Sequence, residues 1–289
     1  RGGQSTHLFR AASAVVGQVR GGLAMSVVWA ATVFGAICGS SVATTATFGR
    51  AVLPELRRHR YGDALATGVT AISGVLGILI PPSVILVVYA ISTEQNIIKL
   101  FAAALIPGLL AGVFYCIAIA WYVRRNPDAA PLAEDGVSGE RRAALLKVWP
   151  LVLVILITLG GIYGGFFTAT EGAAVGTLAM LAVGLLQRQL DRHGFITSLL
   201  NTAETAAMIF LILLGAEVFN AFLASTQMPE QLASLISDSG MPPYGVIAGL
   251  LIIYILLGAV MDELAMMLLT LPIFFPIVVA LDFGMPPDE

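Results

Sequence analysis

Residues 39–47 (GSSVATTAT) form a small polar island inside an apolar stretch, and residues 77–83 (GILIPPS) interrupt the next apolar stretch. The two prolines of the second segment have no N–H group, so the carbonyls of Gly77 and Ile78 lose their i+4 helical partners. In hydrocarbon, unpaired backbone groups are tolerated only where protein buries them or where they line a cavity. The two segments therefore predict a polar site built partly from backbone at mid-membrane, as in secondary transporters.

The composition is that of a polytopic membrane protein. Of the 289 residues, 58% are hydrophobic and 11% charged, whereas soluble domains carry about a quarter charged residues. The two cysteines, Cys38 and Cys116, lie in apolar segments, which argues against a disulfide, and without a histidine cluster they make no metal site. The chain starts at Arg1 and no signal-peptide pattern precedes the first apolar run. We therefore expect an internal fragment.

The positive charges set the expected topology. All fifteen Lys and Arg residues lie at or before Arg192, and basic flanks mark the cytoplasmic side of a membrane. Residues 21–60 are basic at both ends, which predicts a re-entrant helical hairpin that enters from the cytoplasm. Residues 243–285 have acidic flanks, which predicts a second re-entrant hairpin that enters from outside.

The remaining segments are assigned from their apolar length and their polar breaks. We expect an interfacial arm helix at 1–20, a Pro-broken transmembrane helix at 61–92, crossing helices at 93–225 with a cytoplasmic loop at 124–143, and an external arm helix at 226–242. A short surface segment is expected at 191–198, ahead of a crossing helix that starts at Asn201.

The two hairpins look like one unit used twice. The pairs that match at an offset of 222 are Pro54 with Pro276 (276 − 54), Gly62 with Gly284 (284 − 62), and Ser40-Ser41 with Asp262-Glu263. Since the flanking charges differ between the copies, the predicted fold is an all-α integral membrane protein with an inverted-topology repeat. Sites in such folds lie at the repeat interface near the midplane.

Four motifs, taken in order, resemble the large membrane subunit of tripartite ATP-independent periplasmic (TRAP) transporters. They are residues 34–56 (FGAICGSSVATTATFGRAVLPEL), 74–91 (GVLGILIPPSVILVVYAI), 166–176 (FFTATEGAAVG) and 261–277 (MDELAMMLLTLPIFFPI). The resemblance implies an ion-transporter-type fold of two inverted repeats that works as an elevator, driven by a sodium gradient without ATP. It also implies a small membrane subunit and a periplasmic substrate-binding protein as partners, a carboxylate substrate, and the bacterial inner membrane as location. No nucleic acid is expected.

The candidate site residues gather at the hairpin tips and at the proline break. Hard cations favour oxygen ligands, and for Na⁺, the one cofactor expected, the candidates are Cys38, Gly39, Ser40, Ser41, Gly77, Ile78 and Asp262. Helix N-termini favour anions, and the candidate substrate-binding residues are Ser41, Val42, Ala43, Thr44, Ser83, Asp262 and Glu263. A tight turn at the first tip and an N-cap at Asp262 are the purely structural alternatives.

An intramembrane enzyme and a channel are the other classes of protein considered. An enzyme needs a nucleophile with its base, paired aspartates on facing helices, or a zinc motif such as HExxH. The three histidines, His7, His59 and His193, lie at predicted surface positions, and Asp262 has no second aspartate within a helical segment. No enzyme is therefore expected, and coupled flux at a fixed sodium-to-substrate ratio would distinguish a transporter from a channel.

Overall fold

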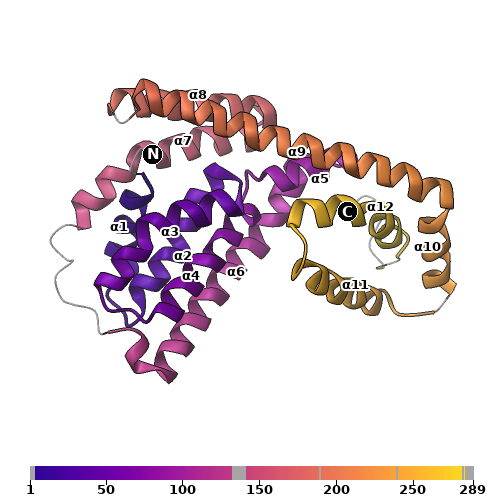
Figure 1. The fold of residues 1–289 in the computed structure, drawn as a ribbon, viewed down its shortest axis with the longest axis horizontal. Helices are drawn as coiled ribbons and strands as arrows, with labels where there is room; N and C mark the ends of the chain where they lie inside the picture. Colours follow the sequence, from indigo (N-terminus) through magenta and orange to yellow (C-terminus); the bar gives the residue numbers. More distant parts are fainter. Residues whose placement is uncertain (1–3, 132–140, 189, 239, 282, 284–289) are drawn as a thin grey trace. The chain divides into compact units, whose positions relative to one another are not determined.

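The computed structural model describes residues 4–131, 141–188, 190–238, 240–281 and 283, and these ranges are mostly helical and contain no β-strand (Figure 1). The chain divides into two compact units, Arg1–Gly194 and Phe195–Glu289. The predicted loop at 124–143 and the predicted repeat partner Gly284 lie partly or wholly outside the described residues. The first unit contains α1 (Gln4–Val16), α2 (Gly22–Cys38), α3 (Ser41–Arg58), α4 (Asp63–Leu79), α5 (Val84–Ser92), α6 (Ile97–Arg125), α7 (Arg141–Tyr163) and α8 (Ala169–Leu186).

The polar island is where α2 ends and α3 begins. Gly39 has a φ of 61°, and its N–H donates to the Gly35 carbonyl at 2.7 Å, which ends α2. Ser40 is extended, and its hydroxyl accepts a hydrogen bond from the Ala43 N–H at 3.3 Å, which starts α3.

Two contacts show that α2 and α3 form a helical hairpin. The rings of Phe34 and Phe48 meet edge to face with centroids 5.5 Å apart, whereas fourteen positions of continuous helix (48 − 34) would span about 21 Å. At the base, Tyr61 lies against the backbone of Leu23 and Ala24, and burial raises the pKa of Tyr61. The start of α2 and the end of α3 therefore lie side by side at the base of the hairpin. That this hairpin enters a membrane from the cytoplasm stays a prediction.

The base of the hairpin is also tied to the segment that follows α6. Arg20, between α1 and α2, donates to the carbonyl of Pro127 at 2.9 Å and to that of Ala130 at 3.5 Å. The N–H of Gly62, just before α4, donates to the carbonyl of Ala129 at 2.9 Å. These bonds join the two hairpin ends to one short stretch of backbone.

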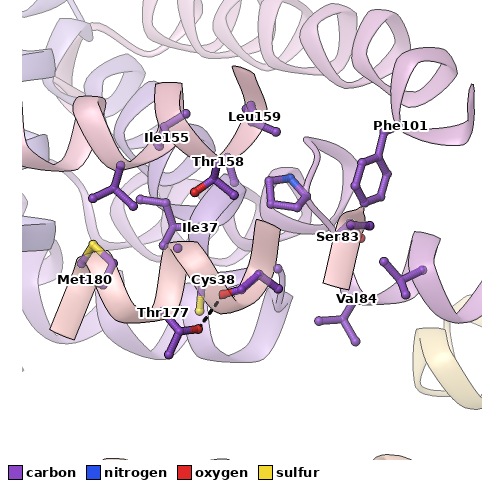
Figure 2. Close-up of a pocket in the computed structure, with 18 of the residues that line it drawn as sticks. Ile37, Cys38, Ser83, Val84, Phe101, Ile155, Thr158, Leu159, Thr177 and Met180 are labelled. Carbon is purple, nitrogen blue, oxygen red and sulfur yellow. Dashed lines mark hydrogen bonds between the residues drawn. The ribbon is translucent and has the colours of Figure 1, made fainter. Parts of the chain in front are cut away.

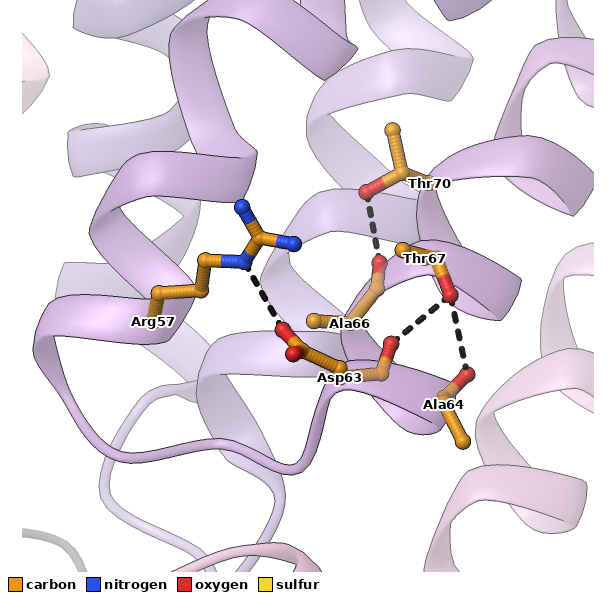
Figure 3. A network of polar contacts seen from close by, with 6 residues as sticks. All are labelled: Arg57, Asp63, Ala64, Ala66, Thr67 and Thr70. Carbon is orange, nitrogen blue, oxygen red and sulfur yellow. Dashed lines mark hydrogen bonds and ion pairs between the residues drawn. The ribbon is translucent and has the colours of Figure 1, made fainter.

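An exposed ion pair connects the end of α3 to the start of α4. Figure 3 shows Arg57 Nε at 2.7 Å from Asp63 Oδ1, with the Thr67 hydroxyl donating to the Asp63 carbonyl at 2.7 Å. The side chains of the pair are 55% and 72% exposed, so the pair contributes little, about 0–1 kcal/mol. Burial of α4 against α2 and α3, centred on Val27, Phe48 and Leu76, contributes more.

The proline pair separates α4 from α5. The N–H of Ile80 makes the last helical bond of α4, to the Leu76 carbonyl at 3.1 Å, and α5 restarts where the Ser83 hydroxyl accepts from the Leu86 N–H at 3.5 Å. The two helices are bent by 43° at this break. Together they are apolar and long enough to cross a membrane as one broken span. Among the described residues, α6, α8 and α9 (Arg192–Thr226) are each apolar and long enough to cross a membrane as a single helix.

The helix α9 differs from its predicted form. The expected helix start at Asn201 is wrong, because α9 starts at Arg192 and continues unbroken to Thr226, and the surface location of 191–198 stays a prediction. No proline interrupts this stretch, so polar residues alone did not end the helix.

The second unit consists of most of α9, α10 (Met228–Asp238), α11 (Pro243–Gly258) and α12 (Glu263–Val279). The Tyr254 hydroxyl of α11 lies 2.8 Å from the Thr270 hydroxyl of α12, and its ring meets Phe274 edge to face at 5.1 Å. These contacts join α11 and α12 as a second helical hairpin. Asp262 is the N-cap of α12, as Ser40 is the N-cap of α3, and the two caps are 222 positions apart (262 − 40), which is the offset of the predicted repeat. The inversion of the two copies in a membrane stays a prediction.

Candidate functional site

The tip of the first hairpin lies directly on the proline break. A Cβ atom on Gly39 would lie 3.3 Å from the N atom of Val84 and 3.4 Å from the carbonyl oxygen of Pro82. Glycine is needed here for two reasons, the close approach and the positive φ. The structure therefore brings together the two segments that the sequence singled out.

Below the tip, α4 packs closely against both helices of the first hairpin, α2 at Gly35 and α3 at Thr45. A Cβ atom on Gly35 would overlap the Cα of Gly77, and one on Gly74 would overlap the hydroxyl of Thr45. No side chain larger than hydrogen fits at Gly35 or Gly74 without a backbone shift. This contact fixes the distance between the hairpin tip and the end of α4.

Thr44 is the most informative side chain at this contact. It is fully buried (0% exposed), and its hydroxyl makes no hydrogen bond of good geometry within the described part of the chain, although it lies beside the thiol of Cys38. Thr44 Oγ1 would lie 3.0 Å from a Cβ atom on Gly77, and the Gly77 carbonyl has no helical donor because residue i+4 is Pro81. A buried hydroxyl without a partner costs about 1–3 kcal/mol. Thr44 Oγ1 thus lies close to the backbone of Gly77, whose carbonyl lacks its helical donor, and small hard cations take such neutral oxygen ligands.

Three predicted site residues act as helix caps. Ser40 caps α3, Ser83 caps α5, and Asp262 caps α12 by accepting from the N–H groups of Leu264 at 3.1 Å and Ala265 at 3.4 Å. A capping hydroxyl keeps a second lone pair, so a cap can also face a cation.

The residues predicted for substrate at the start of α3 face different directions. Val42 is 71% exposed, whereas Thr44 is fully buried, and Ser41 and Ala43 are half-buried. Helical geometry separates neighbours by about 100°, so four consecutive residues cannot share one face. Cys38 and Ile78 are half-buried beside the tip and the break, and in the second unit Asp262 is exposed and Glu263 half-buried.

A cavity of about 620 Å³ lies next to the tip within the first unit (Figure 2). The end of α2 and the face of α5 line one part of it, through Ile37, Cys38, Ser83 and Val84, and α7 and α8 line the rest. None of the residues that line the cavity is charged.

The described ranges contain no group of three or more His, Cys, Asp or Glu side chains that could hold a metal ion. Oxygen atoms of hydroxyls and backbone carbonyls are thus the groups available at this site. Sequence reasoning did not identify Gly35, Gly74 or the part played by α7 and α8. The sequence signal for Gly35 and Gly74 is weak: both are small residues in the apolar segments that lead to the hairpin tip and to the proline break.

The fold and the site define a multi-pass helical membrane protein whose polar groups gather at breaks between apolar helices. The chain matches the family model described as "Tripartite ATP-independent periplasmic transporter, DctM component" over residues 1–285, and it belongs to this family. The resemblance found in the four motifs is therefore confirmed.

Curated relatives carry names of transport proteins. The C4-dicarboxylate TRAP transporter large permease protein DctM of Pseudomonas aeruginosa is 36% identical over 287 residues, covering 99% of this chain and 66% of the relative. The protein of the same name from Vibrio cholerae is 32% identical (97% and 66% covered), and the sialic acid TRAP transporter large permease protein SiaM of Vibrio cholerae is 31% identical (95% and 64%). The chain thus spans about two thirds of the length of these relatives. Its family consists of transporter permeases, not enzymes.

Proposed function

We propose that this chain is part of the large permease subunit of a sodium-driven secondary transporter in a bacterial inner membrane. It would import an organic acid that a periplasmic binding protein delivers. The support is membership of the DctM family together with the apolar helices and their polar breaks. We also propose the elevator mechanism implied by the resemblance, with re-entrant hairpins as the parts that carry the site.

The single observation that carries the sodium proposal is the pair formed by Thr44 and Gly77. The buried hydroxyl of Thr44 makes no hydrogen bond of good geometry among the described residues, and the carbonyl of Gly77 lacks its helical donor. Na⁺ takes neutral oxygen ligands, and backbone carbonyls at broken helices are where transporters coordinate it. We propose one Na⁺ here, with Ser40 and the carbonyls of Cys38, Gly39 and Ile78 nearby, and a second at Asp262.

The substrate proposal rests on the helix N-termini. At the tip and the break, α3 starts after Ser40 and α5 starts after Ser83. The first N–H groups of a helix and its dipole favour an anion. A carboxylate held by these two helix starts agrees with relatives named for C4-dicarboxylate and sialic acid, while another relative is named for ectoine.

We propose two partner proteins, a small membrane subunit and a periplasmic binding protein, since the family is described as tripartite and periplasmic. One relative is named isethionate TRAP transporter permease protein DctMQ, and this chain covers 44% of it, against 66% of the DctM of Pseudomonas aeruginosa. The additional length of that relative leaves room for a second component in the same chain.

Uptake by the complete transporter tests the proposal. The full-length permease is reconstituted with its small subunit in vesicles, its binding protein is added outside, and labelled C4-dicarboxylate or sialic acid is supplied. We expect uptake only with an inward sodium gradient and with the binding protein, and none with an equal potassium gradient. Uptake that needs ATP, or that persists without sodium, would contradict the proposal.

A further inference from the structure

The cavity beside the hairpin tip has an apolar wall built from helix faces. Val84, Val87 and Val88 contribute one face of α5, and Ile155 and Leu159 contribute one face of α7. On α8 the lining residues are spaced along a single helical face and include Ala169, Ala173, Gly176 and Met180. The rim residues Val84 and Ala173 are exposed, so the cavity is open to its surroundings.

Three of the four hydroxyl groups in the lining, those of Ser83, Thr170 and Thr177, take part in hydrogen bonds. Ser83 accepts from the Leu86 N–H, Thr170 bonds to the Thr168 hydroxyl at 3.2 Å, and Thr177 donates to the Ala173 carbonyl at 2.8 Å. The hydroxyl oxygen of Thr158 is the exception, since it is buried without a hydrogen-bond partner among the described residues, and it would lie 3.1 Å from a Cβ atom on Gly176 of α8. An occupant would meet carbon atoms almost everywhere, together with the weakly polar thiol of Cys38.

This lining selects the occupant by its chemistry. A buried water molecule needs two to four polar partners, and apolar cavities stay dry. Between α5, α7 and α8 a carboxylate would be desolvated without a cationic partner, because none of the lining residues is charged, and this is costly. Hydrocarbon fits both the lining and the location, because α8 is apolar and long enough to cross a membrane, where acyl chains are the solvent. A cavity of about 620 Å³ without contents would also forfeit the dispersion contacts of its lining.

We infer that the cavity between the hairpin tip, α5, α7 and α8 binds the acyl chain of a membrane phospholipid. This acyl chain would lie against Cys38 and Ile37 on the side of the hairpin tip and against Ile155 and Met180 on the other side (Figure 2). Neither Thr44 nor Gly77 lines the cavity, but Cys38, Gly39 and Ser83 do, so the lipid site adjoins the proposed ion and substrate sites at the hairpin tip. The inference does not depend on which solute the protein transports.

Photo-crosslinking in a bilayer tests this inference. The full-length permease complex is placed in nanodiscs that contain phosphatidylethanolamine with a diazirine in the middle of one acyl chain. After illumination, peptides are analysed by mass spectrometry. We expect adducts on residues of α5, α7 and α8 that line the cavity. Ala173→Trp, which fills the cavity, should lower these adducts at least fivefold, whereas Ala174→Trp, beside it and outside the lining, should leave them unchanged.

Two results would overturn the inference. One is labelling of the exposed Leu178 on α8 with none on the lining residues of the wild type. The other is complete protection of the lining residues by saturating C4-dicarboxylate, which would make the cavity a substrate site. Both results are measured on wild-type protein, so the inference can be tested even if Ala173→Trp fails to assemble.

Discussion

The hydroxyl of Thr44, in α3, lies against the backbone of Gly77, in α4, so that a Cβ atom on that glycine would be 3.0 Å from Thr44 Oγ1. Thr44 is fully buried and its hydroxyl makes no hydrogen bond of good geometry among the described residues. Gly77 is the position whose carbonyl the proline pair deprives of a helical donor. The hairpin tip and the broken helix therefore meet where a buried hydroxyl lies close to a residue whose carbonyl lacks its helical donor.

The backbone contact below the tip predicts a strong size limit at Gly35. Gly35→Ala would force α2 and α4 apart, since the new Cβ overlaps the Cα of Gly77. Overpacking of this kind costs about 1–3 kcal/mol, which should lower the melting temperature of the purified complex. The matched control is Gly68→Ala on α4, where nothing lies within 4 Å. Equal melting temperatures for the two variants would refute the contact.

The helix break predicts a specific effect of Pro81→Ala. The new N–H could donate to the Gly77 carbonyl and compete with a cation for that oxygen. We expect half-maximal uptake to need several times more sodium. Pro54→Ala, an exposed proline within α3, is the control and should keep wild-type sodium dependence. An unchanged sodium requirement in Pro81→Ala would exclude the Gly77 carbonyl as a ligand.

At the tip of the second hairpin, two substitutions of Asp262 distinguish its role as a helix cap from the role of its negative charge. Asp262→Asn keeps an N-cap that can accept from Leu264 and Ala265, whereas Asp262→Ala removes it at a cost of about 1 kcal/mol. We expect the Asn variant to melt like wild type but to need more sodium for uptake. If the Asn variant also transports like wild type, Asp262 is only a cap.

The hairpin topology predicts a labelling pattern. After replacement of Cys38 and Cys116, single cysteines are introduced at Gly22 or Gly62 and at Gly240 or Gly284. An impermeant maleimide should reach the first two only from the cytoplasm and the last two only from outside. Opposite accessibility for the two ends of one hairpin would disprove that hairpin's re-entrant path.

Much of the helix pattern could be predicted from local signals. The Gly39-Ser40 pair predicts a turn, because glycine takes a positive φ and serine caps a helix start, and the structure has both. The proline pair predicts the end of α4, which comes at Leu79. The start of α9 could not be read from polarity, because polar residues at 191–198 continue a helix as readily as they end it.

The site itself depended on contacts that no local signal contains. The sequence predicts that the helix start at Val42–Thr44 faces the substrate, which stays a prediction, but it does not show that the Val42 side chain is exposed and that of Thr44 buried. The cavity required α7 and α8 to pack near α2 and α5, contacts between residues far apart in the chain. Such packing is decided by the shapes of whole helix faces and not by any one motif.

Sodium-dependent thermal stability of Thr44→Val tests the central claim most directly. Valine has the shape of threonine but lacks the hydroxyl, so without sodium the variant should be at least as stable as wild type, because an unpaired buried group is gone. Wild type and Thr44→Ser should melt at higher temperature in sodium than in potassium. Thr44→Val should show no such rise, or require about tenfold more sodium, as expected for a lost ligand of roughly 1–3 kcal/mol. A Thr44→Val variant with the sodium-dependent rise of wild type would contradict a cation site at Thr44 and Gly77.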